Sequence, residues 1–206
     1  MRRNCIRIAV MFALLPQVTR AQHVVGPHPD KVVSAPIVLD AASEGFETIL
    51  ARVGDDLYIG GQPNAEALRR LHDRGVTTVV NLRTAPEMAK VGFDEAALVR
   101  SLGMKYVYLP VRGTQELPYS PRTVDAFSRA LEEANGAVLL HCTVAWRASH
   151  LWTAYLIKDR GMSPDSALAQ GRAINLMDAH HSGAGRQPVE DFLGRDLDAL
   201  KRYRTP

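Results

Sequence analysis

Cys142 and Arg147 lie close together in the segment His141-Cys142-Thr143-Val144-Ala145-Trp146-Arg147, and these two residue types could act together on an anion. A cysteine thiolate is a strong nucleophile. It is favoured at the start of a helix, where unpaired N–H groups and the positive end of the helix dipole lie. An arginine adds a permanent charge and a planar fork that matches two oxygens of a phosphate group. We therefore expect Cys142 to be a nucleophile and Arg147 to bind the anion.

The surroundings of this pair supply further candidates. His141 could help to ionise the cysteine, or it could simply bond the backbone at the end of a strand. Arg83 follows another predicted strand and could bind substrate, although a surface salt bridge would explain it equally well. Ser149 and Glu116 are candidate accessory groups. The residues expected to bind substrate are Thr143, Val144, Ala145, Trp146 and Arg83.

The amino terminus has the pattern of a secretory signal peptide. Arg2, Arg3 and Arg7 precede a short apolar run, and Ala21 ends a plausible cleavage site. The run is shorter than the roughly 20 residues that cross a bilayer. We therefore expect residues 1–21 to be removed from a periplasmic or secreted protein that is not inserted in a membrane.

Removal of residues 1–21 changes the charge and the cysteine content. Four arginines and no acids are lost, so the 25 basic residues fall to 21, against 22 acidic ones. A nearly neutral chain gives no reason to expect a nucleic-acid partner. Cys5 is also lost, which leaves Cys142 as the one thiol, either reactive or a small buried hydrophobe. His180 and His181 lie among turn residues, and neither a metal nor another cofactor is expected.

The elements that must position these residues alternate apolar runs with amphipathic stretches, as β-α units do. Residues 137–140 are wholly apolar, which favours a central strand, and ligands bind beyond the carboxyl ends of such strands. Other strands are predicted at 57–59, 77–80 and 106–109, and helices at 64–75, 93–102, 121–131, 147–158, from 163, and around 189–200. The sequence predicts one α/β domain over residues 46–206, after a linker at 22–45. Its central, mainly parallel sheet has about four strands flanked by helices.

His141-Cys142 followed by Arg147 resembles the signature loop of protein tyrosine and dual-specificity phosphatases. The sequence is most similar to a bacterial group related to the phosphatase-like half of beta-lactamase-hydrolase-like fusion proteins. The resemblance covers roughly residues 46–177 and includes other shared stretches, Tyr58–Pro63, Gly75–Arg83, Gly103–Tyr106 and Ala167–Leu176. It implies a phosphatase-like fold and hydrolysis of a phosphorylated protein or small molecule through a cysteinyl-phosphate intermediate.

The chain departs from the phosphatase pattern in ways that keep two other functions open. Four residues, and not the usual five, separate Cys142 from Arg147, and Ala145 or Trp146 replaces the usual loop glycine. A four-residue gap also occurs in rhodanese-type sulfurtransferases, whose cysteine carries a persulfide. No aspartate lies between residues 110 and 121, where a general acid is expected, only Glu116. A phosphate-binding module with little catalysis is therefore the third hypothesis.

Overall fold

The computed structural model describes residues 33–177 and 186–203 of the chain. The expected signal peptide at 1–21 and the histidines at 180 and 181 lie outside the described residues. Export therefore stays a prediction, which the mass of the mature protein from its native host can test. Within the described residues, no helix has both the length and the apolar character needed to cross a membrane.

A six-stranded sheet forms the centre of the molecule, with the strands in the order β1-β2-β3-β6-β4-β5. Strands β3, β6, β4 and β5 are mutually parallel, whereas β1 and β2 pair antiparallel with their neighbours. The strands are β1 (Pro36–Leu39), β2 (Leu50–Val53), β3 (Leu57–Gly60), β4 (Val76–Asn81), β5 (Lys105–Tyr108) and β6 (Ala137–His141). The predicted α/β class and the parallel part of the sheet are confirmed.

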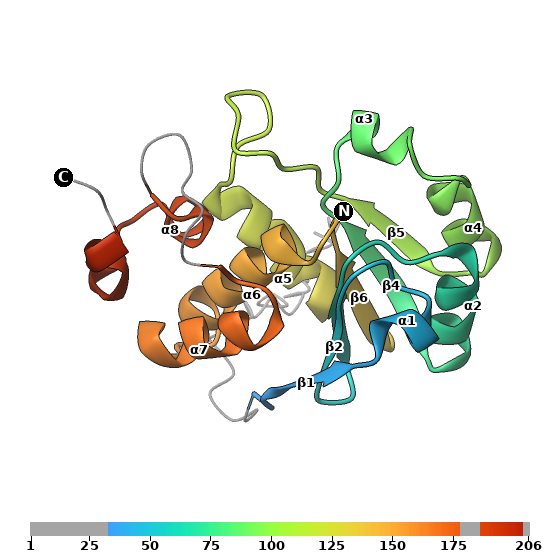
Figure 1. The fold of residues 1–206 in the computed structure, drawn as a ribbon, viewed down its shortest axis with the longest axis horizontal. Helices are drawn as coiled ribbons and strands as arrows, with labels where there is room; N and C mark the ends of the chain where they lie inside the picture. The colour runs from blue at the N-terminus through green and yellow to red at the C-terminus, as the bar shows by residue number, and fades with distance from the viewer. Residues whose placement is uncertain (1–32, 178–185, 204–206) are drawn as a thin grey trace, which may run out of the picture.

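Helices cover both faces of this sheet, as Figure 1 shows. Helices α5 and α6 pack on one face, where α7 and α8 lie against α6, and α2 and α4 pack on the other. The longer helices are α2 (Ala65–Asp73), α4 (Glu95–Ser101), α5 (Pro121–Glu132), α6 (Trp146–Lys158), α7 (Pro164–Ile174) and α8 (Pro188–Leu193). Two one-turn helices, α1 (Ala41–Glu44) and α3 (Ala85–Met88), and a 3-10 helix η1 (Asp198–Tyr203) complete the described elements.

Local signals in the sequence explain where several helices begin. The side chain of Asn64 accepts a hydrogen bond from the amide of Ala67, and that of Ser163 accepts one from Ser166. Such caps satisfy amides that the first turn of a helix leaves unpaired. Pro121 and Pro164 stand at the first helical position, where no amide hydrogen is needed.

Strand β6 is the central strand that its composition predicts. All five of its residues are buried, and β3 and β4 flank it on either side. Side chains along it alternate between two apolar clusters, so that Leu140 faces the α5–α6 side and Leu139 the α2–α4 side. Because β6 is buried on both faces, the loop after it emerges in the middle of the carboxyl edge of the parallel strands.

The predicted strand count and linker need correction. The sheet has six strands instead of about four, because β1 and β2 add an antiparallel edge. Residues 36–44, placed in the linker by their prolines and lack of period, form β1 and α1. Both elements have only four residues, too few to show a period, and β1 leaves Ile37 and Val38 more than half exposed.

Candidate active site

Cys142 lies directly after β6, at the carboxyl edge of the sheet. Its side chain is 1% exposed, and its amide donates to the carbonyl of Gly60, 3.2 Å away. The amide of Gln62 donates to the carbonyl of Thr143 over 3.1 Å, and Asn175 donates to the carbonyl of Val144. The loop that carries the thiol is therefore fixed by the turn after β3 and by the segment after α7.

Ala145 turns this loop into helix α6. Its φ of 62° places it in the left-handed region, where it is the one non-glycine residue among the described parts of the chain. The sequence singled out Ala145 as a replacement for the usual loop glycine, and the structure explains why glycine would suit this position. The start of α6, where the positive end of the helix dipole lies, is therefore next to Cys142, and such a position favours an anion.

Arg147 is held by several acceptors at once. Its Nη1 donates to the backbone carbonyls of Leu82 and Val111, over 3.2 and 2.9 Å. Both terminal nitrogens also bind the carboxylate of Glu87, Nη1 to Oε2 over 3.0 Å and Nη2 to Oε1 over 2.6 Å. Burial lowers the pKa of Arg147, but hydrogen bonding to Glu87 and the charges around the guanidinium outweigh it and raise the pKa. Arg147 thus brings a fixed positive charge into the loop of Cys142.

Glu87 is a site residue that sequence reasoning missed. It belongs to α3, and its carboxylate also accepts from the amide of Thr84 and from the hydroxyl of Thr143, at 2.8 and 3.1 Å. Burial raises its pKa, but the bonds to Arg147 and Thr84 outweigh burial and lower the pKa to about 2. The spacing of Thr84 and Glu87 is a capping-box signal in the sequence, yet that signal gives no hint of the arginine.

His141 and Glu95 form a second buried pair on the opposite face of β6. The Nε2 atom of His141 lies 3.1 Å from Oε1 of Glu95, and both side chains are 0% exposed. Gln62, Asn81 and Tyr106 also donate to this carboxylate. The sequence indicates His141 as a candidate but not Glu95, because the two residues lie 46 positions apart along the chain.

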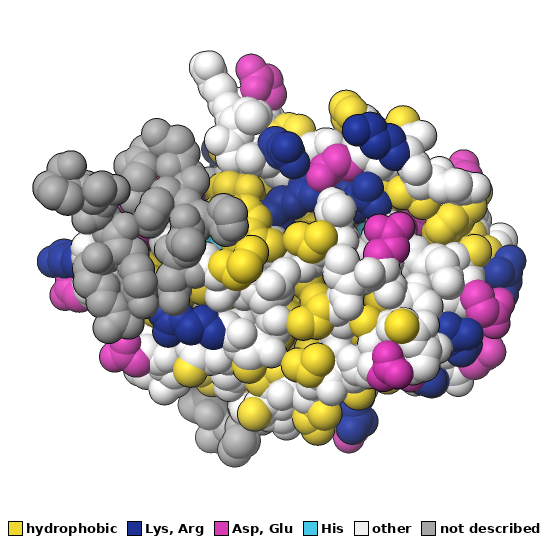
Figure 2. Space-filling model, viewed as in Figure 1, with side chains coloured by type: hydrophobic (Ala, Val, Ile, Leu, Met, Phe, Trp, Pro, Cys, Tyr) yellow, Lys and Arg dark blue, Asp and Glu magenta, His cyan; other side chains and the backbone are white. Residues whose placement is uncertain are grey.

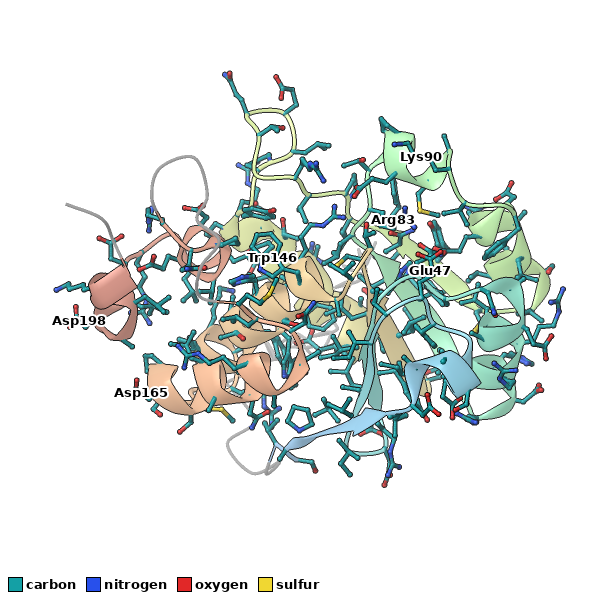
Figure 3. The ribbon with its side chains drawn as sticks, viewed as in Figure 1. Glu47, Arg83, Lys90, Trp146, Asp165 and Asp198 are labelled. Atoms are coloured by element: carbon teal, nitrogen blue, oxygen red, sulfur yellow. The ribbon has the colours of Figure 1, made fainter. Side chains whose placement is uncertain are left out.

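Arg83 lies next to this network. Within the described residues its hydrogen bonds are to an amide side chain and a backbone carbonyl, and not to a carboxylate. Arg83 is buried, and its guanidinium donates to the side chain of Gln62 and to the carbonyl of Glu87. Figure 3 labels Arg83 and Lys90 near α3, and Trp146 across from them at the start of α6. Figure 2 shows basic side chains around an acidic one in this part of the surface, beside an apolar patch.

The other predicted residues differ in their placement. Thr143 contacts both Arg147 and Glu87, and Val144 is 38% exposed at the rim. The hydroxyl of Ser149 donates to the carbonyl of Ala145 over 2.7 Å and lies within helix α6. Glu116 is exposed on the segment before α5.

Tyr119 is a further residue near the thiol that the sequence did not indicate. Burial is the main cause that raises its pKa to about 12, against the lowering effect of Arg147, and Cys142 also acts on it electrostatically. Its ring packs against Phe192 with 5.1 Å between the centroids. Tyr119 thus lines the α5–α8 side of the site.

Across the described ranges, no group of three or more His, Cys, Asp or Glu side chains is arranged to hold a metal ion.

Known proteins resemble this chain in sequence. The model of one protein family, described as "DSP-PTPase phosphatase fused to NAD+ Kinase", matches residues 36–185. A beta-lactamase hydrolase-like protein from Xylella fastidiosa is 33% identical over 123 residues, which are 59% of this chain and 28% of that protein. The chain therefore spans less than a third of the length of this relative.

Solved structures share the fold. A DUF442 protein from Shewanella putrefaciens CN-32 is 26% identical, with a TM-score of 0.50 over 65% of this chain and 84% of that chain. TpbA from P. aeruginosa is 21% identical, with a TM-score of 0.54 over 82% of this chain and 95% of that chain. A variant of TpbA has been solved in complex with phosphotyrosine.

Proposed function

Because the chain belongs to the DSP-PTPase phosphatase family, whose model matches residues 36–185, we propose that it hydrolyses phosphoric monoesters through Cys142. The observation that carries this proposal is the loop after β6. It holds a buried cysteine, the start of helix α6 and the fixed charge of Arg147 within one short segment of chain.

The reaction has two steps. In the first, the thiolate of Cys142 attacks phosphorus, an S–P bond forms, and the P–O bond to the leaving group breaks. Loop amides and Arg147 stabilise the charge on the phosphoryl oxygens during this transfer. In the second step, water attacks the phosphorus of the cysteinyl phosphate, the S–P bond breaks, and phosphate leaves with the thiolate restored.

Protonation of the leaving group is the step with least support from the described residues. Glu116 is exposed, and Glu87 is bound to Arg147 with a pKa lowered to about 2. A carboxylate with so low a pKa holds no proton to donate near neutral pH. We therefore expect the enzyme to act best on esters with good leaving groups, such as aryl phosphates. Phosphotyrosine, which a TpbA variant binds, is the natural ester to test alongside.

The test compares an aryl phosphate with thiosulfate and cyanide as substrates of the purified protein. We expect aryl phosphate hydrolysis, its loss in Cys142→Ser, and competitive inhibition by inorganic phosphate. Rhodanese-type transfer remains the second candidate, because four residues separate Cys142 from Arg147. Thiocyanate formation through Cys142 without phosphatase activity would replace the proposal with sulfur transfer. Phosphate binding without either activity would indicate the binding module.

A further inference from the structure

The hydroxyl of Tyr119 is a proton donor that the two steps above do not use. Tyr119 is 9% exposed and belongs to the same apolar cluster as Cys142 and Ala145. A buried tyrosine hydroxyl usually finds a hydrogen-bond partner. Among the described residues this hydroxyl has none, and its oxygen is not sealed from solvent. It is therefore open to a group that enters the site.

The ring of Tyr119 is held in place by two parts of the chain. It packs against Phe192 of α8, with 5.1 Å between the ring centroids. Gly113 lies so close to the ring that a Cβ there would be 2.6 Å from Cε2 of Tyr119. The amide of Gly113 donates to the carbonyl of Leu117 over 2.9 Å, which closes the loop before Tyr119. The phenol thus has a defined position before a substrate binds.

The charges around Tyr119 are those of the reacting groups. Burial is the largest cause that raises the pKa of Tyr119 to about 12. Arg147 and Arg112 lower this pKa electrostatically, whereas Cys142 and Glu87 raise it. The phenol therefore carries its proton near neutral pH, and the two guanidinium groups would stabilise a phenolate formed at this position.

The segment from residue 110 to 120, where a general acid is expected, contains no better donor. Its one carboxyl group is that of Glu116, which is exposed. Glu87 of α3 lies at the site, but its pKa is lowered to about 2 and it holds no proton near neutral pH. Tyr119 belongs to the same segment as Glu116 and, unlike it, is packed into the cluster of the thiol.

We propose that Tyr119 is a catalytic residue that donates its hydroxyl proton to the leaving oxygen in the first step. This inference rests on the proposed function, because it supplies the proton which that reaction requires. As the P–O bond breaks, the O–H bond of Tyr119 also breaks, and the proton passes to the leaving oxygen while a phenolate remains. In the second step, the water that attacks the cysteinyl phosphate gives a proton back to the phenolate as the S–P bond breaks.

The experiment compares kcat/KM for p-nitrophenyl phosphate and phenyl phosphate, because this constant reports the step in which the leaving group departs. p-Nitrophenolate leaves without a proton, whereas phenolate is about as basic as tyrosinate and gains from a donor. We expect Tyr119→Phe to keep hydrolysis of p-nitrophenyl phosphate within about twofold and to lower kcat/KM for phenyl phosphate roughly tenfold, a modest effect because a phenol is a weak acid. Phenylalanine keeps the ring contacts with Phe192 and Gly113, so a purely structural role predicts equal losses with both esters.

Two further variants accompany this comparison. Tyr155→Phe is the matched control, because Tyr155 is a tyrosine of helix α6 whose ring packs against Phe127, 5.5 Å away between centroids. It should leave the ratio of the two constants unchanged. Glu116→Gln tests the rival donor in the same segment. A selective loss with phenyl phosphate in Glu116→Gln, and none in Tyr119→Phe, would assign the proton to Glu116 and overturn the proposal.

Equal effects of Tyr119→Phe on the two esters, or no effect, would also overturn it. The proposed function would still stand if Cys142→Ser abolished hydrolysis of p-nitrophenyl phosphate, so the two proposals can fail separately. A protein that hydrolyses neither ester contradicts both.

If Tyr119→Phe does not fold, the pH dependence of kcat/KM for phenyl phosphate in the unmodified protein decides the matter. A level value between about pH 7 and pH 9 supports a phenol as donor, since a phenol keeps its proton over this range. A decline of about tenfold per unit between about pH 6 and pH 8, as a carboxylic acid donor requires, contradicts the proposal.

Discussion

At the scale of single residues, the site has its charge in place before a substrate binds. Arg147 is 5% exposed and is fixed by two backbone carbonyls as well as by Glu87. Its position thus costs no ordering of a flexible side chain when an anion enters. A planar fork is needed for this arrangement, because the acceptors lie around two different nitrogens.

The first prediction concerns the replacement of Arg147. We expect Arg147→Lys to lose nearly as much aryl phosphatase activity as Arg147→Ala, on the order of a hundredfold or more. A lysine keeps the charge, but one ammonium group cannot bind Glu87 through two nitrogens and reach the carbonyls of Leu82 and Val111 as well. Steady-state kinetics of the three proteins check this. Near-normal turnover in the lysine variant would mean that charge alone is enough.

At the scale of elements, the sequence predicts what depends on local pattern and misses what depends on long-range contact. Periodicity and caps predict α2, α4, α5 and α6, and an apolar run predicts β6, because each signal lies within the element. Cys142 and Arg147 lie in one loop and could be paired by inspection. Glu87 and Glu95 could not, since the contacts that define their roles join residues 60 and 46 positions apart.

Close packing of α7 on α6 gives a second prediction. A Cβ atom on Gly171 would lie 2.2 Å from Oγ1 of Thr153 and 2.9 Å from Cδ1 of Leu176. Thr153 cannot turn away freely, since its hydroxyl donates to the carbonyl of Ser149. We expect Gly171→Ala to lower the free energy of unfolding by about 1–3 kcal/mol, measured by urea denaturation. Gly92→Ala is the control, because a Cβ there meets no atom within 4 Å. Equal stability of the two variants would show that α6 and α7 can move apart to accept the added methyl group without lowering the free energy of unfolding.

At the scale of the whole molecule, the layered fold places two ion pairs on the two sides of one strand. Glu87 and Arg147 lie at the open edge of the sheet, whereas Glu95 and His141 lie between β6 and α4. Both carboxylates are bound by cations or donors only in the folded chain. Unfolding exposes them to water and returns their pKa values to those of ordinary glutamates, near 4.3. Stability and the charge of the site are therefore linked through pH.

The third prediction is that the protein loses stability in acid below about pH 4.5. The pKa values of Glu87 and Glu95 are each lowered to about 2 in the folded protein, where burial raises them but Arg147 and His141 act more strongly in the other direction. The unfolded chain therefore binds more protons as the pH falls from about 4.5 towards 2. The stabilisation is complete above that range and is lost within it.

Most of the expected loss of stability in acid comes from Glu95, the more buried of the two carboxylates. For Glu95, a lowering of its pKa by roughly two units corresponds to about 3 kcal/mol, whereas solvent screens part of the contribution of Glu87. Urea unfolding at pH 7, 5, 4 and 3 measures the loss, and Glu133→Gln serves as a control with an exposed carboxylate. Glu95→Gln should be less stable than the unmodified protein at pH 7 and should lose less stability between pH 5 and pH 3, because it has no carboxylate left to protonate at that position. A parallel decline of the two proteins would mean that folding does not lower the pKa of Glu95.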